Sequence, residues 1–500
     1  MSAHVMNKNL SSSLDENIKF FEELFQGDDT LRFRRFGNQR NLHMTYCILY
    51  INGMVNENII TDTILHPLVS TTFELNEVQG LDTMIEQVID SAFANKTGDM
   101  DLLIEAILDG QAVLFVDGIQ EAIIICTREV KTRAIEEPDS ERVLRGPKEG
   151  FTECITDNLT MLRRKLKTVN LKLNSRVIGT ETRTSIYVCY LEGIANPQIV
   201  EELNKRLNAI ELDGVLDSGY IQELIRDSPL SVFKTVGSTE RPDVVAGKLL
   251  EGRIALLVDG TPVALTIPFI FVEYFQSPDD YYLNYYFSST GRMLRILGFL
   301  ITISIACLYS ALVTFHQEMI PSALVFNIYA AREGVPFPTI VEATGMLIVF
   351  EILRETGLRM PTLMGQALSI VGALVIGQAA VEAKFISAPI VIVIALSGIT
   401  GLMVPKLKGA VILIRFAFIA LSGILGLYGY VFGLAGLLIH LFELRSFGVP
   451  YMYKLMLLNF KEDIKDTAIR APWWYMRYRP GLIALNKIRN TTKNRQRNKQ

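Results

Sequence analysis

Residues 296–315 read ILGFLITISIACLYSALVTF and contain no Asp, Glu, Lys or Arg. A helix of about 20 apolar residues is long enough to cross the hydrocarbon core of a membrane. Three later stretches, 360–381, 385–405 and 416–442, also lack all four charged residue types. We therefore predict an α-helical multi-span membrane domain with four spans, at residues 296–315, 360–381, 385–405 and 416–442.

The regions on either side of this domain are expected to lie in the cytoplasm. No stretch before residue 292 qualifies as a span, so a large water-exposed head precedes the first helix. The chain's net charge is −4, yet residues 445–500 hold 13 Lys+Arg and only 3 Asp+Glu. Lys and Arg next to a span are retained on the cytoplasmic side. The first residues lack the basic and apolar pattern of a secretory signal.

The head contains an internal duplication. The segment Tyr50–Asn56 (YINGMVN) recurs as Tyr190–Asn196 (YLEGIAN), and Val116-Asp-Gly118 recurs as Val258-Asp-Gly260 at nearly the same offset. Asp-Gly supplies the positive φ angles that a two-residue hairpin requires. Each copy is therefore expected to contain a strand, a helix and a closing hairpin, with Asp117 and Asp259 as turn residues. The predicted fold of the head is α/β (or α+β), in two duplicated subdomains.

These features divide the chain into five expected parts. They are a flexible N-terminal segment (1–40), a first cytoplasmic subdomain with a connecting helix at 152–167 (41–180), a second cytoplasmic subdomain (181–290), the helical membrane domain (291–445) and a basic cytoplasmic tail (446–500).

The sequence favours neither an enzyme nor a metal site. Its five cysteines and five histidines are scattered, without a CxxC pair, a Cys/His spacing or a nucleophile set. We therefore expect no cofactor, no metal and no catalytic residues. Basic residues and aromatics interleave in the tail, and directly after a span this pattern favours anionic lipid headgroups over nucleic acid.

A charged loop between the two repeats reads Arg145-Gly-Pro-Lys148-Glu149-Gly-Phe151. Its glycines and proline can form a rigid turn ahead of the helix at 152–167. The alternative is a contact between subunits, for which Arg145, Lys148 and Glu149 are the candidates.

Ionisable residues crowd the stretch between the first two predicted spans. Three prolines interrupt it, so we expect short or re-entrant helices at 319–331 and 340–353. A charge inside a bilayer costs about 2.5–3.5 kcal/mol and persists only when it is paired or hydrated. Glu351 can pair with Arg354 one turn away. Glu342 has no basic residue at that spacing, so it either faces water, an ion or another subunit, or lies at the headgroup level.

The number of spans stays open between four and six. With four, Lys406, Lys408 and Arg415 would lie outside, against the positive-inside trend. Splitting residues 410–444 into a glycine-kinked hairpin and promoting 340–353 to a span gives six and removes this conflict.

The stretch 360–381 is rich in glycine, alanine and glutamine. Positions 366, 370, 373 and 377 fall on one helical stripe, with Ser369 beside it. Such a stripe either packs closely against other helices or lines water in an oligomer, with an apolar constriction. The pore-lining candidates are Gln366, Ser369, Ile370, Ala373, Leu374 and Gly377.

Several motifs resemble one family along the length of the chain. They are RGPKEGF at 145–151, STERPD at 238–243, EGVPFP at 333–338, GLRMP at 357–361 and GQALSIVGALVIGQ at 365–378. The chain resembles the A subunits of the GerA-type nutrient receptors that trigger germination of bacterial endospores. The resemblance implies an inner spore membrane protein that acts with a transporter-like B subunit, which binds the germinant, and a lipoprotein C subunit. It also implies an oligomeric, ligand-gated cation channel, with the helix at 360–381 surrounding the pore.

Two hypotheses of function follow. In the first, copies of the chain form a homo-oligomeric channel that transduces germinant binding into ion release. In the second, the membrane part is an anchor and the two-subdomain head binds a small ligand. Secondary transport by this chain alone is weaker, because no inverted repeat is visible among the spans.

Overall fold

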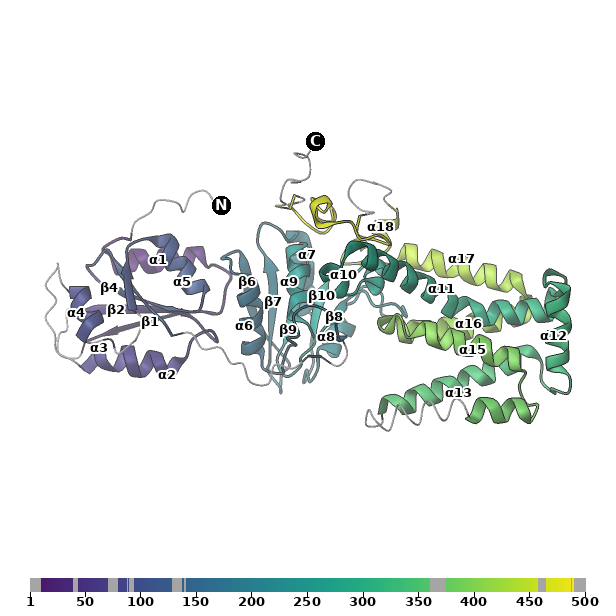
Figure 1. Cartoon of the computed structure of the whole chain (residues 1–500). Helices are drawn as coiled ribbons and strands as arrows, with labels where there is room; N and C mark the ends of the chain where they lie inside the picture. Colours follow the sequence, from purple (N-terminus) through teal and green to yellow (C-terminus); the bar gives the residue numbers. More distant parts are fainter. Residues whose placement is uncertain are drawn as a thin grey trace. The chain divides into compact units, whose positions relative to one another are not determined.

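The computed structural model describes residues 10–38, 44–70, 80–87, 89, 94–127, 137–138, 141–359, 375–456, 465–486 and 488–489. The chain divides into two compact units. The head unit comprises Met1–Asp227, Val236–Pro268 and Arg477–Asn490, and the helical unit comprises Ser228–Thr235 and Phe269–Met476 together with the last residues, Thr491–Gln500. Figure 1 labels their elements.

The first subdomain of the head is a five-stranded antiparallel sheet with helices, in the strand order β1-β2-β4-β5-β3. Its elements are α1 (Leu14–Leu24), β1 (Leu31–Gly37), β2 (Thr45–Ile51), α2 (Glu57–Ile59), the π-helical turn η1 (Ile60–Leu65), α3 (His66–Ser70), α4 (Gly80–Gln87), β3 (Ala94–Thr97), α5 (Met100–Leu108), β4 (Ala112–Val116) and β5 (Ala122–Ile125).

The second subdomain repeats this topology, with the strand order β6-β7-β9-β10-β8. Its elements are α6 (Ile155–Lys165), β6 (Leu171–Ile178), β7 (Thr184–Leu191), α7 (Pro197–Asn208), α8 (Ser218–Ile225), β8 (Gly237–Thr239), α9 (Pro242–Leu250), β9 (Ile254–Val258) and β10 (Ala264–Ile267). The predicted duplication is confirmed, and because both sheets are antiparallel the head is α+β.

The two Asp-Gly turns make the same contacts in both copies. The Asp117 carboxylate accepts a hydrogen bond from the Leu14 N–H at the start of α1, and Asp259 accepts one from Ile155 at the start of α6, each at 3.2 Å. The following glycines have φ near +85° (87° and 83°), as a hairpin turn requires. Each turn therefore also caps the first helix of its own repeat.

A buried ion pair joins the two subdomains within the head unit. Arg163 on α6 pairs with Asp28, just before β1, and the two side chains are 1% and 0% exposed. Asp28 also accepts hydrogen bonds from the backbone N–H (3.1 Å) and the hydroxyl (2.7 Å) of Thr30. The backbone beside Asp28 forms a bridge to Leu173 of β6. Charge and backbone contacts together hold the subdomains in one arrangement.

The structure corrects two of the expected boundaries. The segment 1–40 contains α1 and β1, whose Phe21 and Leu31 are buried in the first core. The connecting helix belongs to the second subdomain, because Leu159 and Leu162 of α6 pack in the core of that sheet. The prediction missed β1 because one face of LRFRRFG is charged and exposed, so the segment reads as polar.

The helical unit begins with a short 3-10 turn and ends in the tail. Its elements are η3 (Phe271–Phe275), α10 (Asp279–Tyr282), α11 (Tyr285–Phe315), η4 (Gln317–Met319), α12 (Ser322–Arg332), α13 (Thr339–Arg359), α15 (Ala388–Gly401), η5 (Pro405–Leu407), α16 (Lys408–Leu425), α17 (Leu427–Glu443), β11 (Arg445–Ser446), β12 (Val449–Pro450), α18 (Tyr453–Met456) and η6 (Trp473–Tyr475).

The structure also tests the predicted spans. Among the described residues, two helical stretches are long and apolar enough to cross a membrane, Tyr285–Phe315 and Pro405–Leu425, while α15 and α17 are apolar but shorter. The region predicted as a short helix at 340–353 forms the single 21-residue helix α13. Residues 360–374 of the predicted span 360–381 lie outside the described residues.

The predicted single span at 416–442 is wrong. The chain turns at Gly426, whose φ is +60°, and α16 and α17 pack against each other on either side of it (Figure 1). At Gly429 a Cβ atom would lie 2.1 Å from the Leu421 carbonyl oxygen, so only glycine permits this close approach. The glycine-broken hairpin, which the sequence left as an alternative, is the observed arrangement.

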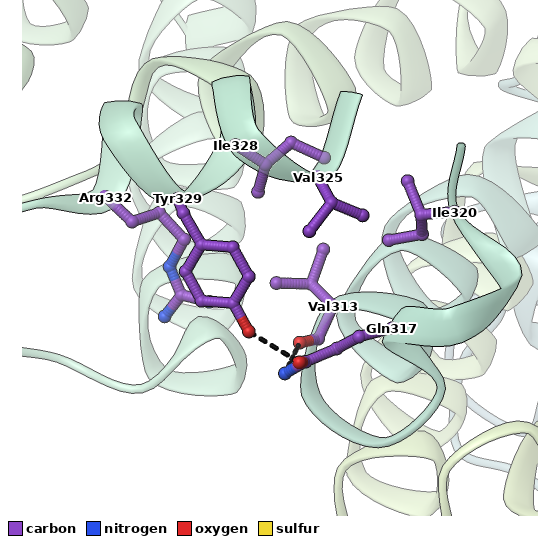
Figure 2. A pocket seen from close by; sticks show the side chains of 7 residues that line it. All are labelled: Val313, Gln317, Ile320, Val325, Ile328, Tyr329 and Arg332. Atoms are coloured by element: carbon purple, nitrogen blue, oxygen red, sulfur yellow. Dashed lines mark hydrogen bonds between the residues drawn. The ribbon is translucent and has the colours of Figure 1, made fainter. Parts of the chain in front are cut away.

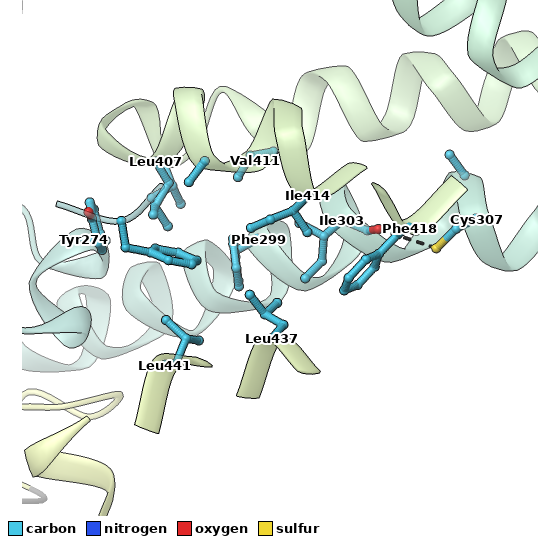
Figure 3. Packing of buried hydrophobic residues seen from close by; sticks show 14 of the residues in the cluster. Tyr274, Phe299, Ile303, Cys307, Leu407, Val411, Ile414, Phe418, Leu437 and Leu441 are labelled. Carbon is cyan, nitrogen blue, oxygen red and sulfur yellow. Dashed lines mark hydrogen bonds between the residues drawn. The ribbon is translucent and has the colours of Figure 1, made fainter. Parts of the chain in front are cut away.

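An apolar core holds α11, α16 and α17 together (Figure 3). Phe299 and Ile303 of α11 lie among side chains of α16 and α17, including Ile414, Phe418 and Leu437. Small residues bring the helices close, as where a Cβ on Gly433 would lie 3.2 Å from the Phe418 ring. This core supports the buried polar groups described below.

We predict that Asp28→Ala destabilises the head by about 3–5 kcal/mol, because it leaves the Arg163 guanidinium buried without its counter-charge. Adding Arg163→Met should recover most of that loss. The matched control is Asp15→Ala, which removes an exposed pair with Arg35 (2.6 Å) and should cost at most about 1 kcal/mol. Chemical denaturation of the full chain, followed by circular dichroism, measures both. Equal losses from Asp28→Ala and Asp15→Ala would contradict the structural role of the buried pair.

Candidate functional site: buried charges of the helical unit

Glu342, one of the two acids singled out in the sequence, is buried where three helices meet. It lies in the first turn of α13 and is 3% exposed. Its Oε2 accepts hydrogen bonds from the backbone N–H (2.8 Å) and the hydroxyl (2.7 Å) of Ser387, the residue that precedes α15. Its Oε1 lies 3.3 Å from Nη2 of Arg332 at the end of α12. A single carboxylate thus connects α12, α13 and α15.

Arg332 also lines a small pocket between the end of α11 and α12 (Figure 2). The Tyr329 hydroxyl donates a 2.5 Å hydrogen bond to Oε1 of Gln317, whose amide donates to the Val313 carbonyl at 3.0 Å. The other lining residues are Ile320, Val325 and Ile328. The pocket is therefore largely apolar, with Arg332 linking it to the Glu342 carboxylate.

Glu351, the second acid, binds two guanidinium groups. It pairs with Arg354 on the same helix, as the spacing predicts, and its Oε1 lies 3.2 Å from Nη1 of Arg415 on α16. The Arg415 side chain is 2% exposed, so this residue is buried inside the bundle. Two cations share one anion here, which ties α13 to α16 and leaves the cluster with an excess positive charge.

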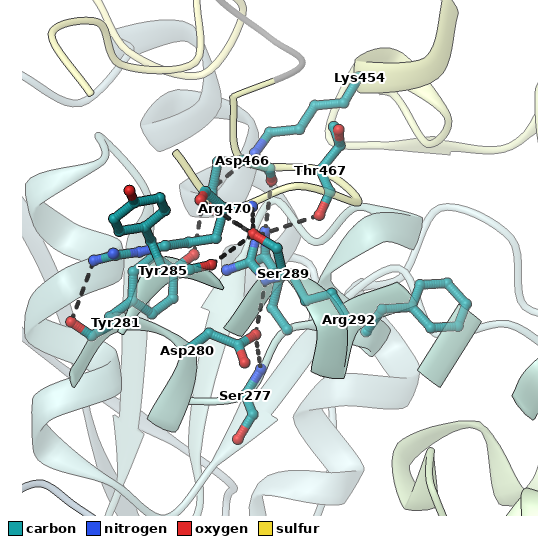
Figure 4. Close-up of polar contacts among 12 residues, drawn as sticks. Ser277, Asp280, Tyr281, Tyr285, Ser289, Arg292, Lys454, Asp466, Thr467 and Arg470 are labelled. Atoms are coloured by element: carbon teal, nitrogen blue, oxygen red, sulfur yellow. Dashed lines mark hydrogen bonds and ion pairs between the residues drawn. The ribbon is translucent and has the colours of Figure 1, made fainter. Parts of the chain in front are cut away.

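A third network lies where α11 begins (Figure 4). Arg292 is fully buried, and it donates to Asp280 at 2.7 Å and to Asp466 of the tail at 2.6 Å. Arg295 donates to the other oxygen of Asp280 at 2.7 Å. Nζ of Lys454 lies 3.7 Å from Asp466. These charges fasten the tail residue Asp466 to the first turns of α11.

The pKa of Asp466 is lowered despite its burial. Burial of the carboxylate acts to raise its pKa, but the charges of Lys454 and Arg292, with hydrogen bonds from Arg292 and Tyr281, outweigh burial and lower it. The Tyr281 hydroxyl donates to Asp466 at 2.9 Å. Asp466 therefore remains ionised at any physiological pH, and the attachment of the tail should not change over that range.

The aromatic part of the tail packs on the same region. The Trp473 indole N–H donates to the Tyr281 carbonyl at 3.3 Å, and the Arg470 guanidinium lies 5.2 Å from the Trp473 ring. The Trp473 side chain is nevertheless half exposed. It combines one apolar face and one hydrogen bond, a combination that suits a membrane interface.

The pore-lining candidates Gln366, Ser369, Ile370, Ala373 and Leu374 lie outside the described residues. Gly377 is described, and it is buried in a helical segment at 375–382. A Cβ atom there would lie 3.7 Å from Val391 of α15. The small residue at this position thus faces a neighbouring helix of the same chain.

The subunit-contact candidates lie in a loop of the head unit. Glu149 binds Lys165 (2.8 Å) and Arg164 (3.7 Å) of α6, so it fastens the loop to its own subdomain. Lys148 lies 3.3 Å from Glu137 but keeps 70% of its side chain exposed, and Arg145 is exposed as well.

Sequence reasoning missed Asp280, Asp466 and Lys454. Arg292 and Arg295 lie at the start of an apolar helix, where each needs an anionic partner. The nearby Asp280 could have been predicted as that partner. Asp466 is 174 residues from Arg292, and no pattern of spacing connects residues so far apart. Among the described residues, no group of His, Cys, Asp and Glu side chains could hold a metal ion.

Comparison with known proteins gives a consistent result. The model of the family described as "Bacillus/Clostridium GerA spore germination protein" matches residues 19–482. Spore germination protein KA of Bacillus subtilis is 41% identical over 95% of this chain and 87% of its own length. A B. subtilis protein named "Uncharacterized membrane protein YfkQ" is 39% identical over 94% of this chain and 91% of its own length.

A solved structure is also similar. It is the N-terminal domain of the A subunit of the Bacillus megaterium spore germinant receptor GerK3, at 35% identity. The match covers 53% of this chain and 98% of that one, with a TM-score of 0.43.

We predict that Glu342→Ala lowers the thermal midpoint of the detergent-solubilised chain, because it leaves the Arg332 guanidinium and the Ser387 N–H without their acceptor. Removing one partner of a buried pair costs about 3–5 kcal/mol. Glu355→Ala is the matched control, since it removes an exposed pair with Arg359 (2.8 Å) and should leave the thermal midpoint almost unchanged. A thermal midpoint unchanged by Glu342→Ala would show that this carboxylate does not stabilise the folded helical unit.

The attachment of the tail should be lost only in strong acid. A carboxylate whose pKa falls on folding stabilises the folded state above about pH 4, the pKa of an unfolded Asp, and loses that contribution as the pH falls through its lowered value. The chain's two tryptophans, Trp473 and Trp474, report on the tail. Their emission should be constant from pH 7 to about pH 4 and shift to the red in stronger acid.

The variant Asp466→Asn should show the red-shifted emission already at pH 7. The control Glu443→Gln, at an exposed carboxylate of the same unit, should titrate like the unaltered chain. A transition between pH 5 and pH 7, or unaltered emission in Asp466→Asn, would argue against the network in Figure 4 as the attachment.

Proposed function

Because this chain belongs to the GerA family of spore germination proteins, we propose that it is the A subunit of a germinant receptor and forms a ligand-gated cation channel as a homo-oligomer. In this proposal a transporter-like B subunit binds the nutrient, and a lipoprotein C subunit completes the receptor. The helical unit lies in the inner spore membrane, and the head and the tail face the spore core. The chain transduces nutrient binding into ion release and catalyses no reaction.

The observation that carries the proposal is the Glu342 carboxylate, held inside an apolar helical bundle by Arg332 and Ser387. Ionisable groups are costly inside a membrane, where they mark ion pathways, relays and assembly points. Two of the described helical stretches are long and apolar enough to span, and a similar protein is named a membrane protein. An inert anchor would need no such buried charge.

The buried charges suit a part that moves as one body. Glu342 connects α12, α13 and α15, and Glu351 connects α13 to α16. Breaking either cluster would expose a charge to apolar surroundings, so the helices are expected to shift together. In the proposal their displacement moves the adjoining stretch 360–381, whose stripe of small and polar residues lines the pore.

The stripe 366–377 supplies the test. Ile370→Ala or Ala373→Ser should widen or hydrate the constriction and release monovalent cations severalfold faster than the unaltered receptor in the absence of germinant. The matched control is Ile392→Ala on α15, an exposed apolar side chain, which should leave the basal flux unchanged. Ion release from spores or from vesicles carrying the whole receptor measures the effect. Unaltered flux in both stripe variants would refute the pore assignment.

A further inference from the structure

Residues 141–149, which precede α6, are held in the head unit by several hydrogen bonds. Arg241, fully buried just before α9, donates to the carbonyls of Pro147 (2.6 Å) and Glu141 (3.3 Å). The Val143 N–H donates to the Glu137 carboxylate at 3.1 Å, and this bond is the main cause of the lowered pKa of Glu137. The sequence motifs at 145–151 and 238–243 therefore meet in space.

This loop presents an apolar side chain among basic ones. Leu144 is 83% exposed, although leucine favours a buried position. Arg142, Arg145 and Lys148 are exposed beside it, whereas Glu141 and Glu149 at the ends of the loop are less exposed and are bonded within the subdomain. Arginine is enriched at the centres of protein interfaces, so exposed arginines beside an outward-facing leucine suit a contact with an acidic, apolar surface.

The same subdomain carries a surface of that kind on α8. Leu216, Tyr220 and Leu224 are 71%, 46% and 50% exposed, and the last two are one turn apart. Residues 209–225 contain four carboxylates and no Lys or Arg. These exposed carboxylates are Glu211, Asp213, Asp217 and Glu223. We call this the α8 surface, and its charge and apolar side chains complement those of the loop.

The two surfaces belong to opposite faces of one sheet. The loop leads into α6 and is fastened at α9, and both helices pack on the face that carries Cys189, Ala255 and Leu257. Side chains alternate along strands, so Val188 and Leu256 point to the other face, where they are also buried. Helix α8 contacts β10, and its buried Ile221 and Ile225 do not belong to the core of the α6 and α9 face, so we infer that α8 packs on the other face. One copy therefore presents the loop and the α8 surface in different directions.

We propose that the loop 141–149 of one copy docks on the α8 surface of a second copy. This rests on the proposed function, which requires copies to assemble, and it identifies where the heads meet. The contact is heterologous, because different patches face each other, so it repeats head to tail, and it forms a ring when the rotation between neighbouring copies closes. Opposite charges steer the two surfaces together and fix their register.

The test is cross-linking of the full chain in membranes that carry the whole receptor. Leu144→Cys and Leu224→Cys are combined in a background with the exposed cysteines replaced (Cys126→Ser, Cys154→Ser), and a short bis-maleimide is added without germinant. The two-cysteine variant should give a ladder of linked species larger than dimers. Each single-cysteine variant should stay unlinked.

Three outcomes would overturn the proposal. The two-cysteine variant could remain monomeric, Leu144→Cys alone could link as a dimer, which indicates a symmetric contact, or Leu144 could link to a different receptor polypeptide. None of these readouts involves ion flux. If the cross-linked ladder is absent but spores with Ile370→Ala leak cations, only the docking surface is refuted. If the ladder forms but the stripe variants leave the ion flux unaltered, only the channel is refuted.

Ionic strength supplies a second measurement that does not risk misfolding. Surface charges are screened beyond about 8 Å at physiological salt and more strongly above it, so the yield of linked species should fall severalfold in high salt. Reversing both surfaces together (Arg142→Glu, Arg145→Glu, Asp213→Arg and Glu223→Arg) should restore a yield that either reversal alone abolishes. A yield insensitive to salt and to single reversal would contradict the charge pairing.

Discussion

A charged side chain inside an apolar helical bundle is stable only when another charge or a set of hydrogen bonds compensates it. This constraint determines how the helices of the second unit are joined. Glu342 binds Arg332 and Ser387, Glu351 binds Arg354 and Arg415, and Arg292 binds Asp280 and Asp466. Each cluster connects segments that apolar packing alone would allow to slide, because dispersion contacts are not directional.

In the head, a buried ion pair joins two subdomains, as buried ion pairs join helices in the helical unit. Two subdomains of the same topology each use an Asp-Gly turn to close a hairpin and to cap a helix. Neither of these turn contacts joins the two subdomains. The ion pair between Arg163 and Asp28 joins them. A head whose halves are joined by a buried ion pair can transmit a displacement as one body, whereas a flexible link would absorb it. This property suits a subunit that relays a signal.

The sequence predicted those features that leave a local pattern. Asp117-Gly and Asp259-Gly predicted the hairpins, and the recurrence of their surroundings predicted the duplication. The spacing of Glu351 and Arg354 predicted their pair. Contacts between distant segments left no such pattern, because Arg415 is 64 residues from Glu351 and Arg332 is on a different helix from Glu342.

At two places the composition of the sequence did not identify the observed secondary structure. The glycines of 416–442 suited both a tilted span and a hairpin, and only the close approach of Gly429 to Leu421 separates these. Strand β1 was overlooked because Arg32, Arg34 and Arg35 outweigh its buried face in any average over the segment. The family motifs identified the chain correctly, since short motifs spread along the whole length are more specific than composition.

In the assembled receptor, the stripe at positions 366, 370 and 373 is proposed to face water. The test is to introduce cysteines one at a time along the stretch 366–377 of the full receptor. Each variant is then treated with a membrane-impermeant thiol reagent, which labels only cysteines that water reaches. Labelling should recur at positions 366, 370 and 373, accelerate when germinant is added, and be weak at the positions between and at the buried position 377. Cysteines that stay unlabelled along the whole stretch, with and without germinant, would contradict it.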